Sequence, residues 1–431
     1  MRIPPPLAAG AISLAAIVIV YFRAIFAFFF EDDFNWLATT AWAFHPSRIF
    51  DLGAYNHFYR PVIELYFWAA TPLFGGSPVL FHLFNIALHA ANGLLLFLIA
   101  RQLGASDRQA TLASLFFVVL PGYIEAVAWV GALAEPLSAV FGCLALYMLL
   151  RHLAAPSARR WIGSLLCFLL ALLTHESAIV FLPILVLGAW WAPSPLRAAR
   201  LVQVLAPYAV VAVVYLAIEI PITRRNYLVE QNLYTPGLHM VENVLGYIAA
   251  LYVGKRNTAS FVVIAAAIVL LLARGTPRVR FATCWMLLAL MPFAPFTWGN
   301  MSRYLYLPAM GFGLLLAEGV EWFDRRLLSR ATMPVRRVAV VMLSVAIAVR
   351  FMTFAIKGVE NFAARTEMYR QFLAELRAQR PHLPHDTAVE ISQAVDAKMA
   401  QRFIESAVQW EYQDPTLRVV VSPSPSSRED D

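Results

Sequence analysis

Long apolar runs separated by short polar breaks form the main pattern of this chain. Eleven runs approach or reach the roughly 20 apolar residues that a helix needs to cross a bilayer. They cover residues 7–30, 79–100, 107–122, 131–151, 160–175, 177–192, 200–220, 258–273, 280–297, 303–322 and 336–356. The pattern therefore predicts an all-α polytopic membrane protein with about eleven transmembrane helices.

Two further apolar stretches are too short to count as spans. Residues 61–75 are bounded by Pro61 and a Gly-Gly pair, and residues 241–254 carry Glu242 near their start. We expect each to form a half-helix or a helix at the membrane interface. The sequence leaves open whether 241–254 crosses the membrane.

The distribution of charge predicts the orientation. If the N-terminus is cytoplasmic, most Arg and Lys residues of the short loops lie on the cytoplasmic side, with clusters in 151–160, 274–280 and 325–337. This asymmetry follows the positive-inside rule, and eleven spans then place the C-terminus outside. Acidic residues gather instead near the outer face, where we expect the polar chemistry.

The composition agrees with a membrane protein. Hydrophobic residues make up 60% of the 431 residues and charged residues 14%, and the mean hydropathy is +0.64, whereas soluble chains are about 25% charged. The net charge of +7 does not indicate nucleic-acid binding, because the Lys and Arg residues lie in short loops. The Ala-, Arg- and Pro-rich sequence favours a bacterial cytoplasmic (inner) membrane.

The composition changes after Lys357. Residues 358–421 are polar, and their pattern predicts a helix over 359–380, a strand over 387–392, a helix over 397–412 and a strand from 417. We therefore expect a membrane domain over 1–357, a small extracytoplasmic α/β appendage over 358–421 and a disordered tail over 422–431.

Three acids, Glu31, Asp32 and Asp33, follow the first apolar run. Acids are unfavourable at the C-terminal end of a helix, so their position needs a reason. In a structural interpretation, Asp33 caps a following helix and its neighbours mark the water boundary. In a functional one, the pair acts as a base that accepts a proton from a hydroxyl nucleophile.

The other polar breaks also allow two interpretations. Arg60 and Arg303 suit either phosphate binding or anchoring at the membrane surface, as does Tyr304. Glu125 is either a second acid of a site or an ordinary loop acid. His175 and Glu176 lie in a sequence, THES, that a tight outer turn explains; it is not HExxH, which excludes a zincin.

Histidines within the apolar runs also need an explanation. His82, Asn85 and His89 share one face of a predicted helix. The two histidines are two turns apart, which is poor spacing for a metal ion, so we expect hydrogen bonds between helices. The cysteines Cys143, Cys167 and Cys284 lie inside apolar runs and indicate neither a disulfide nor a metal site.

Taken together, six segments resemble the GT-C superfamily of integral-membrane glycosyltransferases. The resemblance is strongest to bacterial relatives of the protein O-mannosyltransferases and to the membrane part of TPR-bearing O-mannosyltransferases. The segments occur in the family's order: EDDFNWL, YRPVIELYF, SPVLFHLFNIALHAANGLLLFLIARQL, PGYIEAVAWVGALAEPLSAVFGCLALY, LTHESAIVFLPILVL and SRYLYLPAMGFGLLLA. No tetratricopeptide array follows them, and His175 stands where a lysine is common.

The resemblance implies a GT-C-type bundle that transfers a sugar from a polyprenyl-phosphate-linked donor. It also implies that the acceptor is a hydroxyl group at the outer face, and in-line attack with a single base predicts inversion at the sugar carbon. The implied catalytic residues are Asp33, Asp32 and Glu125, with Asp33 slightly preferred as the base. The donor-phosphate residues are Arg60, Arg303, His175, Glu176 and Tyr304.

Several properties stay open at this point. Mg²⁺ or Mn²⁺ would be bound by Asp32 and Asp33 if a metal takes part. The expected partners are the lipid-linked sugar, an acceptor protein or envelope glycan, and membrane lipids. A transporter or flippase, or a polymerase or ligase, for polyprenyl-linked glycans is the alternative. The sugar, the acceptor, the isoprenoid length and the oligomeric state are not indicated.

Overall fold

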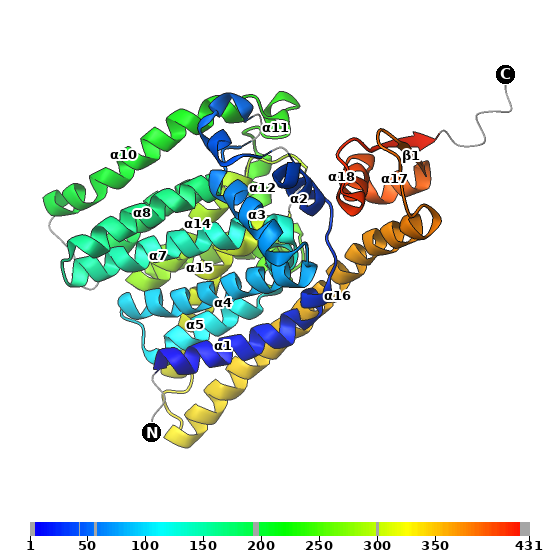
Figure 1. The fold of residues 1–431 in the computed structure, drawn as a ribbon. Coiled ribbons are helices and arrows are strands. Elements are labelled where there is room, and N and C mark those ends of the chain that lie inside the picture. Colours follow the sequence, from blue (N-terminus) through cyan, green and yellow to red (C-terminus); the bar gives the residue numbers. More distant parts are fainter. Residues whose placement is uncertain (1–4, 43, 56–57, 193–197, 299–300, 423–431) are drawn as a thin grey trace.

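The fold is described by a computed structural model of residues 1–431. The described residues exclude 1–4, 43, 56–57, 193–197, 299–300 and 423–431. The described chain is a bundle of long helices that run in roughly the same direction in Figure 1, with shorter helices gathered at one end. A small C-terminal appendage lies beyond that end.

Eleven helices fall on the eleven predicted apolar runs. They are α1 (Pro5–Tyr21), α4 (Pro78–Gln102), α5 (Asp107–Val119), α7 (Ala134–Ala154), α8 (Ala158–Thr174), α9 (Phe181–Trp190), α10 (Ala198–Thr223), α13 (Thr258–Arg274), α14 (Pro277–Leu290), α15 (Tyr306–Arg326) and α16 (Met333–Gln379). The mostly helical prediction is therefore confirmed, and the protein is a multi-pass membrane protein.

The count of about eleven transmembrane helices is not confirmed. By length and composition, five described helices are able to cross a membrane: Pro6–Phe26, Pro78–Gln102, Val130–Ala154, Ala199–Thr223 and Met333–Gln379. A sixth candidate joins α5 to 121–128 across a bend of 42°, where Pro121 interrupts the helical hydrogen bonds. Other helices are shorter: α9, which follows the 3₁₀ turn Glu176–Val180, has 10 residues, and α14, which ends just before Pro292, has 14.

Short elements fill one end of the bundle (Figure 1). The α-helices there are α2 (Asp32–Trp42), α3 (Pro61–Phe74), α6 (Ile124–Ala128), α11 (Tyr227–Glu230) and α12 (His239–Leu251). The 3₁₀ turns there include η1 (Phe22–Phe26), η5 (Val130–Ala132), η6 (Glu176–Val180), η7 (Met291–Phe293) and η8 (Ser302–Leu305). The expectation that 61–75 and 241–254 form short helices is confirmed by α3 and α12.

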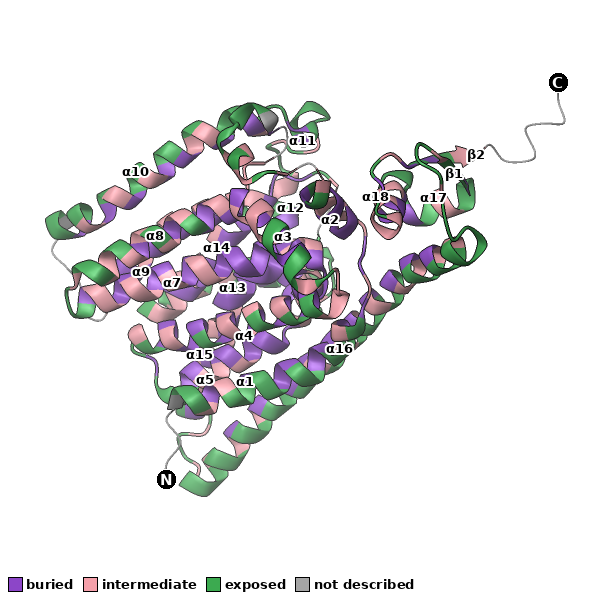
Figure 2. Ribbon diagram, viewed as in Figure 1, coloured by how far each residue is buried: buried purple, intermediate pink, exposed green. Residues whose placement is uncertain are grey.

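Small residues allow the central helices to pack closely. A Cβ atom added to Gly311 of α15 would lie 2.6 Å from the carbonyl oxygen of Ala282 in α14. One added to Gly313 would lie 2.9 Å from the carbonyl oxygen of Ala113 in α5. Glycine at both positions therefore lets the backbones approach, as is common in membrane bundles. Figure 2 shows this centre as the buried part of the molecule.

Hydrogen bonds join the helices at the buried polar residues of α4. The amide of Asn85 donates to the carbonyl oxygen of Trp129 at 3.0 Å. The Nδ1 atom of His89 lies 2.9 Å from the hydroxyl of Tyr306 in α15. Interhelical hydrogen bonding is therefore confirmed for His89, whereas Asn85 bonds to the backbone between α6 and η5.

The helix α16 carries the chain from the bundle to the C-terminal appendage. Its 47 residues span about 70 Å at 1.5 Å per residue, more than twice the thickness of a hydrocarbon core. The helix continues through 357–358 without a break. The appendage then forms β1 (Ala388–Ser392), α17 (Gln393–Met399), α18 (Gln401–Tyr412) and β2 (Arg418–Ser422), with the two strands paired in parallel.

The predicted elements of the appendage are confirmed, except that the helix predicted over 397–412 is divided between α17 and α18. The residue between them, Ala400, has a φ of 51°, which ends one helix and redirects the chain. Of the tail predicted over 422–431, Ser422 ends β2 and the rest lies outside the described residues.

Candidate functional site

The acidic stretch begins a helix rather than ending one. The first helix α1 ends at Tyr21, the 3₁₀ turn η1 ends at Phe26, and Asp32 is the first residue of α2. Both Asp32 and Asp33 lie in the first turn of α2, where a carboxylate is stabilised by the helix dipole. Residues 22–31 therefore separate the end of α1 from the acids: the turn η1, then 27–30 without regular structure, then Glu31 with a φ of 46°.

Asp33 is buried, and both of its oxygen atoms accept hydrogen bonds from the backbone. Oδ2 accepts from the N–H of Phe30 at 2.8 Å, and Oδ1 accepts from the N–H of Gly131 at 2.5 Å. Trp129 adds a third link, because its indole N–H donates to the carbonyl oxygen of Phe30 at 3.1 Å. Burial raises the pKa of Asp33 well above its usual range, against the effect of the two backbone hydrogen bonds. These contacts fasten the start of α2 to η5.

Asp32, by contrast, lines a cavity of about 590 Å³. Among the described residues the side chain of Asp32 accepts one long hydrogen bond, from the Asn35 amide at 3.5 Å, and makes no ion pair. Burial raises the pKa of Asp32 above its usual range, while Arg303 and Arg402 act to lower it. The geometry therefore favours Asp32 over Asp33 as the carboxylate that a substrate would meet.

The cavity is built by distant parts of the chain. Its walls come from α2, the segment before α3, η5 and the start of α7, the turn between α8 and α9, α11, the segment from η7 to η8, and α18. Its polar lining residues include Asp32, Asn35, Arg60, Glu64, Glu135, His175, Glu176, Arg303, Tyr304 and Arg402. Six of the eight predicted site residues thus line one cavity, and Asp33 and Glu125 do not.

Arg60 is already paired within this cavity. Its Nε atom donates to Oε2 of Glu176 at 2.8 Å and its Nη2 atom donates to Oε1 at 2.6 Å, a bidentate arrangement. Arg60 lowers the pKa of Glu176 to about 2 although burial acts to raise it. The pair connects the start of α3 to the turn between α8 and α9.

His175 connects this ion pair to Glu135. The Nδ1 atom of His175 accepts a hydrogen bond from the N–H of Ser177 at 3.1 Å. A neutral ring therefore carries its proton on Nε2, which lies 3.4 Å from Oε1 of Glu135. The side chains of His175 and Glu135 are 6% and 5% exposed. The two buried side chains are therefore neighbours on the cavity wall, and Oε1 of Glu135 accepts no hydrogen bond within the described residues.

Arg303 is held by aromatic rings rather than by a carboxylate. Its guanidinium lies 5.1 Å from the ring centre of Trp129 and 4.9 Å from that of Tyr304. No ion pair to Arg303 occurs within the described parts of the chain. Its Nη2 atom donates a long hydrogen bond, of 3.4 Å, to the Tyr304 hydroxyl, and its other N–H groups are available for an anion.

Stacked aromatic side chains form the wall next to Arg303. The ring centres of Phe293 and Tyr304 are 4.2 Å apart with an angle of 8° between their planes. Phe296 stacks on Tyr304 at 5.4 Å and on Trp298 at 4.6 Å. All four rings line the cavity, so the guanidinium adjoins a flat apolar surface.

Glu125 and Glu31 lie in a separate cluster around Arg365 of α16. Oε1 of Glu125 is 3.6 Å from Nη1 of Arg365, and Oε1 of Glu31 is 4.0 Å from Nη2. The Arg365 guanidinium also covers the ring of Phe30 at 4.6 Å. None of these three charged residues lines the cavity, so Glu125 lies away from the carboxylate that it was expected to accompany.

Four charged or amide residues of the cavity were given no role from the sequence: Asn35, Glu64, Glu135 and Arg402. Glu135 lies in the same segment as Glu125, ten residues later, and its position before Pro136 at the start of α7 was the available signal. Arg402 comes from α18, about 370 residues after Asp32, and no local pattern connects the two. Only the docking of the appendage brings Arg402 to the cavity.

The acidic pair does not fit a metal ion held jointly. Both oxygens of Asp33 are occupied by backbone N–H groups. No group of three or more His, Cys, Asp or Glu side chains with suitable geometry occurs among the described residues.

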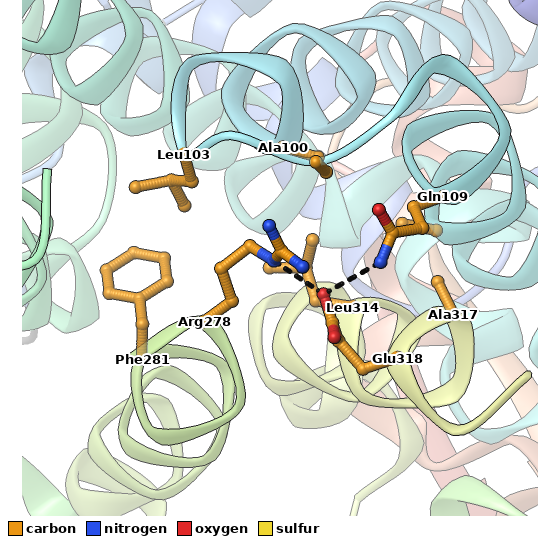
Figure 3. Close-up of a pocket in the computed structure, with 10 residues that line it drawn as sticks. Ala100, Leu103, Gln109, Arg278, Phe281, Leu314, Ala317 and Glu318 are labelled. Atoms are coloured by element: carbon orange, nitrogen blue, oxygen red, sulfur yellow. Dashed lines mark hydrogen bonds and ion pairs between the residues drawn. The ribbon is translucent and has the colours of Figure 1, made fainter. Parts of the chain in front are cut away.

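A much smaller cavity, of about 20 Å³, lies at the opposite end of the bundle (Figure 3). There Glu318 accepts hydrogen bonds from Arg278 at 2.7 Å and from Gln109 at 3.3 Å. Because these groups satisfy one another, this cavity does not offer a comparable site.

Comparison with known proteins supports the fold most strongly. No family profile matches the chain. Protein O-mannosyl-transferase Tmtc1 of Drosophila melanogaster is 32% identical over 139 residues, which are 32% of this chain and 16% of that protein. The chain thus spans about a sixth of the length of this curated relative.

Among solved structures, the apo oligosaccharyltransferase of Archaeoglobus fulgidus matches with a TM-score of 0.56 at 12% identity, over 98% of this chain and 65% of that chain. The same organism's AglB, in complex with an inhibitory peptide and a dolichol-phosphate, matches with a TM-score of 0.54 at 12% identity, over 94% and 63%. The chain spans just under two thirds of these proteins. The resemblance to the GT-C superfamily is confirmed at the level of the fold.

Proposed function

We propose that this chain, which folds as a GT-C-type membrane protein, is a glycosyltransferase that uses a polyprenyl-phosphate-linked sugar. One observation carries the proposal: Asp32 and Arg303 line the same cavity, and neither makes an ion pair among the described residues. A carboxylate and a guanidinium left open to one space are suited to a base and a leaving-group phosphate.

Asp32 acts as the general base in this proposal. The acceptor O–H gives its proton to the Asp32 carboxylate while the oxygen attacks the anomeric carbon. The bond from that carbon to the phosphate oxygen breaks, and the polyprenyl phosphate leaves with the electron pair. Attack opposite the leaving group inverts the sugar carbon. Asp33 holds the start of α2 in place through Phe30 and Gly131 and does not take the proton.

Arg303 stabilises the charge on the leaving phosphate. Arg60 contributes positive potential and holds the turn of Glu176, since its own guanidinium is already paired. The aromatic wall of Phe293, Phe296 and Tyr304 offers a flat surface to the sugar ring or the first isoprene units. Glu135 and His175 complete the polar side of the cavity.

The relatives agree with this donor class. AglB was solved with a dolichol-phosphate, and the curated relative is an O-mannosyl-transferase. We propose that the donor here is likewise a lipid phosphate and the acceptor a hydroxyl of a protein or envelope glycan. Transfer occurs at the outer face of a bacterial inner membrane, with the N-terminus cytoplasmic and the appendage, over 358–421, outside.

The test uses the full-length protein in detergent with a synthetic polyprenyl-phosphate sugar. We expect Asp32→Asn to lower kcat by about 10³-fold, within the range of general-base catalysis. Asp32→Glu should retain part of the activity. The pH profile of kcat/KM in the wild type should show an acid limb above the usual pKa of an aspartate, because burial raises the pKa of Asp32; activity rises with pH as Asp32 ionises.

Asp324→Asn, at the opposite end of the bundle, is the control for removing a buried carboxylate, and its activity per folded molecule should match the wild type. An Asp32→Asn variant that turns over at the wild-type rate would overturn the base assignment. No sugar transfer by the wild type, together with movement of the lipid across vesicles, would favour a flippase instead.

A further inference from the structure

The C-terminal appendage reaches the cavity through a defined contact between two helices. Ser406 of α18 donates a hydrogen bond to Oδ1 of Asn35 in α2. Further along the same helices, the rings of Trp410 and Trp42 lie 6.4 Å apart. Trp410 also covers Gly76, where an added Cβ atom would lie 3.1 Å from the indole. The appendage is therefore packed against the bundle at this point.

This contact places two charged residues at the same opening. Arg402 lies one turn before Ser406 on α18, and Ser406 also donates to the Arg402 carbonyl oxygen at 3.3 Å. Asp32 lies one turn before Asn35 on α2, and the Asn35 amide is directed at it. Because side chains one turn apart share a face of a helix, Arg402 and Asp32 both face the cavity, and both line it.

Arg402 is not engaged in holding the appendage together. Its side chain contacts the ring of Phe403 at 4.4 Å, and within the described residues it makes no ion pair. Arg60, the other arginine that lines the cavity besides Arg303, is neutralised by Glu176. Arg303 and Arg402 are therefore the two cavity arginines without a carboxylate partner in the described chain, one from the bundle and one from the appendage.

We propose that α18 is a wall of the substrate site and that Arg402 binds the phosphate of the lipid-linked donor together with Arg303. This inference rests on the proposed function and adds a residue that the membrane bundle does not supply. The guanidinium of Arg303 belongs to the bundle and that of Arg402 to the appendage. Donor binding therefore depends on the appendage being docked against the bundle. Arg402 is a binding residue here, since the proton transfer belongs to Asp32.

The experiment measures binding of a fluorescent polyprenyl phosphate to the full-length protein in detergent, with steady-state kinetics on the same samples. We expect Arg402→Gln to raise the Kd for the polyprenyl phosphate by about 10- to 30-fold and to raise the KM for the donor. The change in kcat should be smaller. Arg402→Lys should restore part of the affinity, because the charge is kept. Added inorganic phosphate should compete less well against the probe in the glutamine variant.

Arg418→Gln is the matched control, since Arg418 is exposed on β2 of the same appendage and does not line the cavity; it should leave the Kd unchanged. Equal affinity of the wild type and Arg402→Gln would overturn the inference while leaving the proposed function intact. A change confined to the acceptor KM would also overturn it, because Arg402 would then face the acceptor. A wild type that binds no polyprenyl phosphate would overturn both proposals.

Discussion

The two ends of the helix bundle use similar charged residues in different ways. At the end that carries the loops before α5 and α16, the charges satisfy one another. Arg108 contacts Glu321 at 2.5 Å and Asp324 at 2.8 Å, and Arg336 contacts Asp324 at 2.9 Å. At the other end, Asp32 and Arg303 face a cavity of about 590 Å³ with no ion pair among the described residues.

The comparison separates charges that hold the structure from charges available to a substrate. A paired charge near the surface contributes modestly to stability and loses its capacity to bind another ion. A charge kept beside a cavity by aromatic rings or a hydrogen bond has given up part of its hydration without gaining a partner. Such a group binds an incoming ion of opposite sign more strongly than a solvated one does.

The largest expected difference between the two ends of the bundle is the loss of activity when a single arginine is replaced. We expect Arg303→Gln to lower kcat/KM by about 10²- to 10³-fold, because a charge beside the leaving phosphate is lost. Arg108→Gln, which removes a paired guanidinium at the other end, should stay within about twofold of the wild type. The measurement is sugar transfer per folded protein; similar losses for both variants would remove the distinction between the two ends.

A smaller effect, on the free energy of unfolding, is expected when the ion pair between Arg60 and Glu176 is broken. Glu176→Gln leaves Arg60 without a carboxylate and should lower the free energy of unfolding by about 2 kcal/mol at pH 7. The pKa of Glu176 is about 2, below the roughly 4.3 of an unfolded glutamate. The stabilisation is therefore complete above about pH 5 and is lost as the pH falls toward 2.

Detergent-unfolding curves of the wild type and Glu176→Gln test this pair. The difference in stability should narrow as the pH falls from about 5 toward 2. The control is Glu318→Gln, which breaks the contact to Arg278 at the opposite end. A difference for Glu176→Gln that stays constant with pH would show that folding does not lower the pKa of Glu176.

The smallest effect on activity and stability is expected when a methyl group is added to the backbone at Gly131, beside Asp33. A Cβ atom at Gly131 would lie 3.0 Å from Oδ1 of Asp33 and 3.2 Å from the indole nitrogen of Trp129. We expect Gly131→Ala to cost about 1 kcal/mol of stability and to reduce kcat about fivefold, because the start of α2 shifts. Gly319→Ala in α15, where nothing lies within 4 Å, should be neutral or slightly stabilising.

Thermal unfolding and initial rates distinguish these two glycines. If Gly131→Ala keeps the wild-type rate and melting temperature, the contact between Asp33 and η5 does not position Asp32. If Gly319→Ala also impairs transfer, the effect of an added methyl group is not specific to the cavity end.

The sequence by itself determined where the helices are. Runs of apolar residues bounded by Arg, Pro and Gly were sufficient to place the eleven helices that fall on them, because each helix satisfies its backbone hydrogen bonds locally. The strands of the appendage followed from alternating residues in 387–392 and 417–423. The sequence also identified Asp32, Arg60 and Arg303 as candidates, since charged residues are costly beside so much apolar sequence.

The tertiary structure alone decided which of these groups share a space. Adjacent residues on a helix point about 100° apart, so only the packing of α2 against η5 decides that Asp33 is bonded to backbone while Asp32 faces the cavity. The pairing of Arg60 with Glu176 depends on a contact across 116 residues. Arg402 reaches the same cavity because α16 carries the appendage back over α2, a long-range contact that no local pattern encodes.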